Sequence, residues 1–330
     1  RLNLSTGPFS MAPGDTQDIY MGFVVGLGGD RLSSVAVMKA NDRAVQSTFD
    51  ILFQVASPPS NATVKVTELD GELILEWVSD FAKVSDTETK IKNPGNYQFQ
   101  GYNLYQFPSA GASLSAAKRL DTYDVVDGVK VIFDNVFDIA GGRFVDKAIQ
   151  FGSDKGVKRF YRVTRDAIRD IDKLYNGQEY YFAVTAYSYT DVVGYSHSLE
   201  SSPNILTVKP KVPFGTQLNS VFGDTVKVAR TLGVSDGHAE AYVVDPTAVT
   251  GDSYQIKFDS AGTWRVFNVT KNKNVATGQT NQGGGENYPI VDGGLVKVFG
   301  APNDVKDFQH VANPSGPISP PTYVGFGCGF

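Results

Sequence analysis

The side chains in this chain that could carry out chemistry are three histidines, one cysteine and two groups of aspartates. His197, His238 and His310 lie far apart and show no metal-ligand spacing, and Cys328 has no histidine placed to activate it. The chain contains no G-x-S-x-G, H-E-x-x-H or P-loop motif. These residues predict no catalytic site and no cofactor, so we expect a protein that is not an enzyme.

The two aspartate groups leave calcium binding open as a minority alternative. Calcium takes roughly six to eight oxygen ligands, and loops of secreted β domains often supply them. Neither group has the spacing of a known calcium loop, so we expect solvated loop acids and no metal site. The first group flanks a Gly-Gly turn, and the two groups are Asp134, Asp138 and Asp146, and Asp166, Asp170 and Asp172.

Composition favours an all-β protein of more than one domain. The 330 residues suffice for two or three domains, and the chain has 34 Gly, 16 Pro, 16 Tyr and 21 Phe. The net charge of −5, with no Lys/Arg run longer than a pair, predicts no nucleic-acid partner. No apolar run approaches the roughly 18–20 residues of a membrane span.

The chain is organised around one long strand pattern at residues 176–189. It begins with the turn pair Asn176-Gly177, and Tyr180, Phe182 and Val184 then alternate with residues of the other face. Period-two alternation of aromatic and β-branched residues after an Asn-Gly turn is typical of a strand. A strand of this length, apolar on one face, is expected near the centre of a sheet with a covered face.

Residues 1–56 predict a partial β unit followed by an amphipathic helix. Residues 17–27 read as a strand, whose partner strands must lie upstream, in a neighbouring subunit or later in this chain. Residues 31–53 have helical apolar spacing, with Asp30 as the N-cap. The helix either packs on the β unit, which we favour, or binds a partner.

Residues 57–210 contain a set of motifs that is similar to a fibronectin type III domain. The set comprises paired prolines, Leu75-Glu-Trp77, Gly101-Tyr-Asn-Leu-Tyr105 and the run from Leu174 to Tyr187. The resemblance implies a β-sandwich with a corner tyrosine, Tyr180. Such sandwiches take roughly 100 residues, so we expect an insert at 108–175 that adds hairpins to one edge. The resemblance implies these core residues: Trp77, Tyr102, Tyr180, Phe182 and Val184.

Residues 211–308 predict a second β-sandwich or small barrel, because five short strand patterns are separated by turn signals. The fold class expected for the whole chain is therefore all-β, with tandem β-sandwich domains and one amphipathic helix near the N-terminus. The order of these parts also resembles secreted multidomain surface proteins of Bacteroidota-related bacteria. That resemblance implies a secreted, extracellular or cell-surface location.

Residues 309–330 form a Pro/Gly-rich tail whose end alternates apolar side chains with glycine. We hypothesise that this end completes a sheet by strand addition, above all in the next subunit of a polymer, and not merely by folding back on its own chain. The alternative is a tail that only continues into a further domain. The residues of this hypothetical assembly strand are Tyr323, Val324, Phe326, Cys328 and Phe330.

Taken together, these features predict a non-enzymatic structural or adhesive protein of a bacterial surface. It would self-associate or bind other surface proteins, and strand addition could build an extracellular filament. The alternative is an accessory spacer or glycan-binding region of an extracellular hydrolase, with a glycan as its partner.

Overall fold

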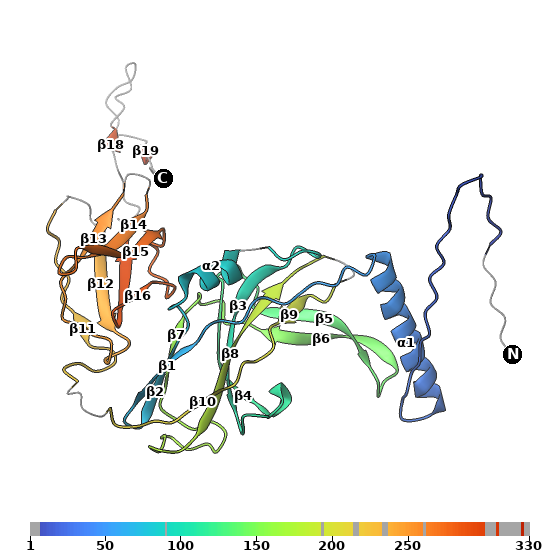
Figure 1. Ribbon diagram of the computed structural model, residues 1–330, viewed down its shortest axis with the longest axis horizontal. Coiled ribbons are helices and arrows are strands. Elements are labelled where there is room, and N and C mark those ends of the chain that lie inside the picture. Colours follow the sequence, from blue (N-terminus) through green and yellow to red (C-terminus); the bar gives the residue numbers. More distant parts are fainter. Residues whose placement is uncertain are drawn as a thin grey trace, which may run out of the picture. The chain divides into compact units, whose positions relative to one another are not determined.

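The computed structural model describes residues 7–89, 91–192, 195–213, 218–232, 237–259 and 262–300, together with the backbone of 308–309 and 325–326. Its chain divides into two compact units, Arg1–Val55 with Asp134–Lys147, and Ala56–Phe133 with Ala148–Phe330. The regular secondary structure of the described residues is mainly antiparallel strand, with two α-helices (Figure 1), which confirms the predicted all-β class.

The larger unit begins with two antiparallel sheets. The first has the order β1-β2-β7, and the second has the order β10-β8-β3-β4 with β9 paired to β8. Their strands are β1 (Lys65–Leu69), β2 (Glu72–Glu76), β3 (Gln98–Phe107), β4 (Lys118–Asp124), β7 (Phe160–Val163), β8 (Tyr180–Tyr189), β9 (Ser198–Glu200) and β10 (Leu206–Val208).

Strand β8 occupies the central position that its alternating pattern predicts. It lies between β3 and β10, and its register places Ala186 opposite Tyr102 and Val184 opposite Leu104. Gly177 in the preceding turn has a φ of 78°, a conformation that glycine adopts without steric cost. The Asn-Gly turn therefore sets the start of the strand.

Both sheets contribute to one hydrophobic core. Trp77, which directly follows β2, has its ring centroid 5.9 Å from that of Tyr102 on β3, in an edge-on arrangement. Leu73 and Leu75 of β2 lie in the same cluster as Val163 of β7 and Val208 of β10. The five core residues implied by the resemblance, Trp77, Tyr102, Tyr180, Phe182 and Val184, are all buried in this cluster.

The C-terminal region forms two further sheets, with the orders β11-β12-β17-β16 and β13-β14-β15. The expected barrel or sandwich region is thus built of strands, as its turn spacing indicated. The strands are β11 (Thr225–Val226), β12 (His238–Val243), β13 (Tyr254–Phe258), β14 (Trp264–Asn268), β15 (Lys273–Gln279), β16 (Ile290–Val291) and β17 (Gly294–Phe299).

The C-terminal region packs directly on the first sheet. Ile74 of β2 and Phe160 of β7 share a second core cluster with Trp264, Leu295 and other residues of the C-terminal sheets. The side chains that alternate with these along β2 and β7 point the other way and enter the first core. Sheet β1-β2-β7 is therefore buried on both faces. The two β regions form a single packed body within the larger unit.

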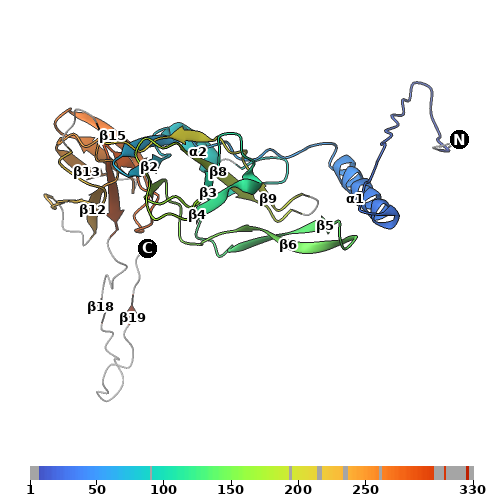
Figure 2. The same cartoon turned by 90° about the horizontal axis from the view of Figure 1, so that it is seen from below.

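The insert at residues 108–175 differs from the expectation of added hairpins alone. It opens with a short 3-10 helix, η1 (Leu114–Ala116), and β4 then extends the sheet edge beside β3. Strands β5 (Val131–Asp138) and β6 (Arg143–Phe151) form a long separate hairpin, which Figure 2 shows as a two-stranded ribbon. Strand β7, however, pairs with β2 and is an integral part of the first sheet.

One helix of the larger unit has no counterpart in the sequence predictions. Helix α2 (Phe81–Thr89) has only nine residues, which is shorter than the window of roughly 11–18 residues over which a helical period is recognised. Asp80 precedes it and accepts a hydrogen bond from the backbone N of Lys83 at 3.1 Å, as an N-cap residue does.

The predicted amphipathic helix is present in the smaller unit as α1 (Arg31–Asp50). Asp30 is its N-cap, as predicted, and exchanges hydrogen bonds with Ser33 in a capping box. The helix ends before residue 53, because Leu52 and Phe53 have φ values of 53° and 58°, in the left-handed region.

The segment at residues 17–27, predicted to be a strand, has no partner strand among the described residues. The segment has extended backbone but belongs to no sheet within the described part of the chain. A strand requires a second strand to receive its backbone hydrogen bonds. Helix α1 supplies contacts to one face of this segment, but a helix has no free backbone row with which to pair.

Candidate interaction surface

The smaller unit carries an extended apolar segment, residues 17–27, which we call the edge segment. It runs beside α1 in the direction opposite to the helix (Figure 1). The ring centroid of Tyr20 lies 5.7 Å from that of Phe49, near the end of the helix. Further along, Asn41 donates a side-chain hydrogen bond to the backbone O of Val25 at 2.8 Å.

Glycines allow the segment to lie close to the helix. A Cβ added to Gly26 would sit 2.2 Å from the backbone N of Met38, and one added to Gly28 would sit 2.4 Å from Ser33 Oγ. Real Cβ atoms do not approach other atoms this closely, so these positions require glycine. The helix therefore holds the segment in one extended conformation.

The opposite face of the edge segment consists of exposed apolar side chains. Phe23, Val25 and Leu27 are 92%, 83% and 86% exposed, and Ile19 and Met21 are more than half exposed. These five residues alternate along the chain, as on one face of a strand. An apolar row of this kind, on a segment that pairs with no strand, is typical of an interaction site rather than of a surface that stays exposed to solvent.

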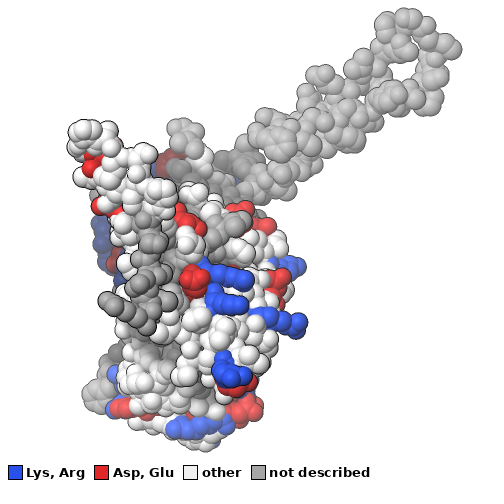
Figure 3. Space-filling view, turned by 90° about the vertical axis from the view of Figure 1, so that its right-hand side faces the viewer, with Lys and Arg blue, Asp and Glu red and all other residues white. Residues whose placement is uncertain are grey.

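Charged residues are scattered over the described surface that Figure 3 shows. In Figure 3 acidic and basic residues are interspersed among uncharged ones, and no field of one sign covers the described residues of this face. Between Asp18 and Asp30 the edge segment carries no charged residue. Recognition here must therefore rely on apolar contact and backbone hydrogen bonds.

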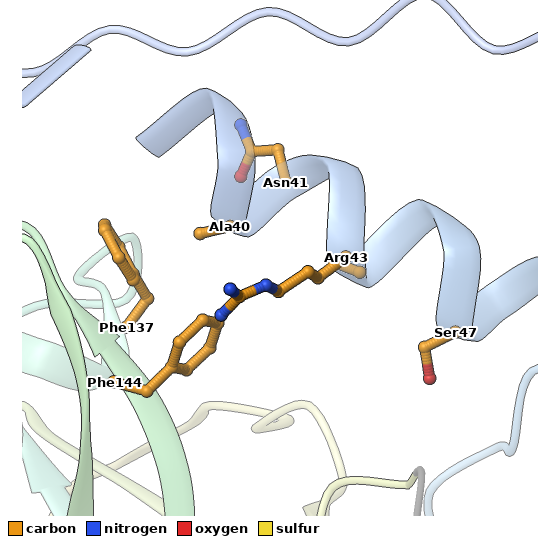
Figure 4. Close-up of a pocket in the computed structure, with 7 residues that line it drawn as sticks. Ala40, Asn41, Arg43, Ser47, Phe137 and Phe144 are labelled. Carbon is orange, nitrogen blue, oxygen red and sulfur yellow. The ribbon is translucent and has the colours of Figure 1, made fainter. Parts of the chain in front are cut away.

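A small pocket lies between α1 and the tip of the β5–β6 hairpin, within the same unit. It has a volume of about 320 Å³ and is lined by Ala40, Asn41, Arg43, Ala44, Ser47, Phe137 and Phe144. Figure 4 shows Arg43 reaching toward the ring of Phe144, and the guanidinium carbon is 5.8 Å from the ring centroid. This cation–π contact between two lining residues connects the helix with the hairpin.

The assembly residues predicted in the tail lie outside the described residues, with one exception. The backbone of Phe326 belongs to β19 (Gly325–Phe326), which pairs antiparallel with β18 (Phe308–Gln309) of the same chain. Tyr323, Val324, Cys328 and Phe330 are not described.

The aspartates considered for calcium bind donors of their own chain. Asp138 accepts hydrogen bonds from the backbone N atoms of Ala140 and Gly141, and Asp166 accepts one from the side chain of Gln106. Asp170 and Asp172 lie within salt-bridge distance of Arg165. Among the described residues, no group of three or more His, Cys, Asp or Glu is arranged to hold a metal ion.

The strongest polar arrangement in the larger unit links its two β regions. The carboxylate of Asp245, in the C-terminal region, accepts hydrogen bonds from Lys65 Nζ and Thr67 Oγ1 of β1, both at 2.9 Å, and from Thr247 Oγ1 at 2.6 Å. Burial, the largest influence, acts to raise the pKa of Asp245, but these hydrogen bonds outweigh it and lower the pKa. The carboxylate is thus held ionised inside the junction.

This junction has no signal in the sequence. Asp245 precedes a proline and reads as a turn residue, while Lys65 and Thr67 read as the polar face of a strand. Only the packing of one region on the other brings them together. For the edge segment, by contrast, the sequence indicated both the alternation and the need for partner strands from elsewhere.

Comparison with known proteins gives no relative: no protein-family model, no curated protein and no solved structure matches this chain. Fold and surface alone therefore define the class, an all-β protein with an exposed apolar edge. Among the described residues no helix is long and apolar enough to cross a membrane.

Proposed function

We propose that this chain is a non-enzymatic structural or adhesive protein of a bacterial surface, and that it acts by self-association. The single observation that carries the proposal is the exposed apolar row of the edge segment on an unpaired backbone. A secreted or cell-surface location rests on the resemblance to multidomain surface proteins.

The middle domain is proposed to be a β-sandwich of the fibronectin type III kind. If β1, β2 and β7 are strands A, B and E, and β3, β8 and β10 are C, F and G, the observed orders match the two sheets of such a sandwich. The hydroxyl of Tyr180 accepts a hydrogen bond from the backbone N of Tyr175 at 2.9 Å, the contact expected of a corner tyrosine.

The junction between the two β regions suits a structural role. The two regions share a sheet that is buried on both faces and a buried carboxylate with three side-chain donors. This junction resists bending between the regions, whereas a Pro/Gly linker between separate domains would not. A stiff body would transmit force along an assembly of repeated subunits.

A glycan-binding role has less support. Both tryptophans, Trp77 and Trp264, are fully buried and offer no ring to a sugar. Retention on insoluble glycans, lost when exposed tyrosines such as Tyr20 or Tyr175 are changed, would favour that alternative.

The test is sedimentation velocity and negative-stain electron microscopy of the purified 330-residue chain over a wide concentration range. We expect concentration-dependent oligomers or filaments. A monomer at every concentration would overturn the proposal. Deletion of residues 322–330 tests the tail separately: loss of assembly would make the tail the connecting strand, and retention would assign assembly to another surface.

A further inference from the structure

We propose that the edge segment pairs antiparallel with the edge segment of a second copy, about a two-fold axis that passes beside Phe23. The inference rests on the proposed self-association and names its surface. Cyclic two-fold dimers are the commonest oligomers, and such an interface requires a patch that is complementary to itself.

The apolar row meets that requirement. With Phe23 opposite Phe23 of the second copy, Met21 lies opposite Val25 and Ile19 lies opposite Leu27. Every member of the exposed row then faces another apolar member, and the most exposed residue, Phe23 at 92%, lies at the centre. Directly opposite side chains of an antiparallel pair are close enough to make these contacts.

The edge segment already has the extended backbone that strand pairing requires. Helix α1 lies against its inner face, with a close approach at Gly26, so the backbone is extended before a second copy binds. A segment already held in its bound conformation loses little entropy on binding. Among the described residues no strand occupies either of its edges.

The positions of the charged residues are also compatible with the pairing register centred on Phe23. No charged residue lies between Asp18 and Asp30, so the paired region contains no like charges opposite each other. The central contacts are therefore apolar on both copies, as the core of a dimer interface usually is.

Cysteine cross-linking in a Cys328→Ser background tests the register. Phe23→Cys should give a disulfide-linked dimer as the main oxidised product, because the two cysteines lie directly opposite each other. Val25→Cys alone should give little dimer, since its opposite residue is Met21. A mixture of Met21→Cys and Val25→Cys chains should give the mixed dimer. Leu232→Cys is the matched control, because Leu232 is 91% exposed and lies outside this unit.

A charge substitution provides an independent measurement. Phe23→Asp should weaken dimerisation by at least roughly 30-fold, the effect of removing a central contact residue. Leu232→Asp should leave the dimer unchanged. Phe23 is exposed and touches no core cluster, so both variants should keep the wild-type melting temperature.

The outcomes separate this inference from the proposed function. If the wild-type chain is always monomeric, both fail. If it assembles but Phe23→Asp assembles equally well, or if Phe23→Cys cross-links no better than Leu232→Cys, only the inference fails. If Phe23→Cys with native Cys328 retained forms a disulfide between positions 23 and 328, the tail is the occupant, and two-fold pairing of the edge segment is wrong.

Discussion

Arg159 donates two hydrogen bonds to the carboxylate of Glu88 and a third to the C-terminal region. Its Nε and Nη2 donate to the two carboxylate oxygens of Glu88 at 2.9 and 2.7 Å, and its Nη1 donates to the backbone O of Asn287 at 2.9 Å. The hydroxyl of Tyr102 donates to the same carboxylate at 2.9 Å. One guanidinium therefore ties α2, the central core and the second β region together.

Arg159→Met should destabilise the larger unit by about 3 kcal/mol, because it leaves the carboxylate of Glu88, whose side chain is only 14% exposed, without its cation. Urea unfolding followed by tryptophan fluorescence gives the free energy of unfolding. The double variant Arg159→Met/Glu88→Met should recover much of the loss, since no charge remains to be desolvated. A loss of less than about 1 kcal/mol in the free energy of unfolding of Arg159→Met would be no more than one ordinary hydrogen bond contributes. That result would contradict this role.

Trp77→Ala should cost about 3–5 kcal/mol, because it opens a cavity at the centre of the first core. Trp77→Phe is the matched control and should cost less: it keeps an aromatic ring, and Trp77 Nε1 has no hydrogen-bond partner to lose among the described atoms. The measurement is thermal melting. An unchanged melting temperature for Trp77→Ala would argue against the proposed sandwich.

Tyr180→Phe should cost about 1 kcal/mol, because the backbone N of Tyr175 loses its acceptor in a partly buried hydrogen bond. Tyr175→Phe retains that backbone N–H and removes a hydroxyl from a side chain that is 45% exposed, so it should be neutral. Equal effects of the two variants in chemical denaturation would show that the corner hydrogen bond contributes nothing.

Asp245→Asn should lower stability at pH 7 by about 1–3 kcal/mol, because the ionised carboxylate accepts hydrogen bonds from Lys65, Thr67 and Thr247. The pKa of Asp245 is lower in the folded chain than its usual 3.8. The stabilisation is therefore complete at pH values well above 3.8 and is lost as pH falls through the folded-state pKa.

The difference in the free energy of unfolding between wild type and Asp245→Asn should consequently shrink below pH 3.8. Thr247→Val, which removes one donor and keeps the charge, should show a smaller loss at pH 7. A difference that stays constant from pH 7 to pH 3 would rule out an ionised Asp245 as its source.

The sequence by itself determined the local structure. The cap at Asp30, the Asn176-Gly177 turn and the alternation of Tyr180, Phe182 and Val184 each act through neighbouring residues, so their signals can be read from spacing. The core positions of Trp77 and Tyr102 were instead implied by the family resemblance of the motifs around them, and both side chains are buried.

Only the tertiary structure decided what covers each face. Ile74 and Phe160 are apolar in sequence, but nothing local shows that a second β region buries them against Trp264. Phe23 has an equally apolar strand pattern and is left exposed. Periodicity shows which side chains share a face, whereas burial depends on contacts between residues far apart in the chain, and these form only when the elements pack.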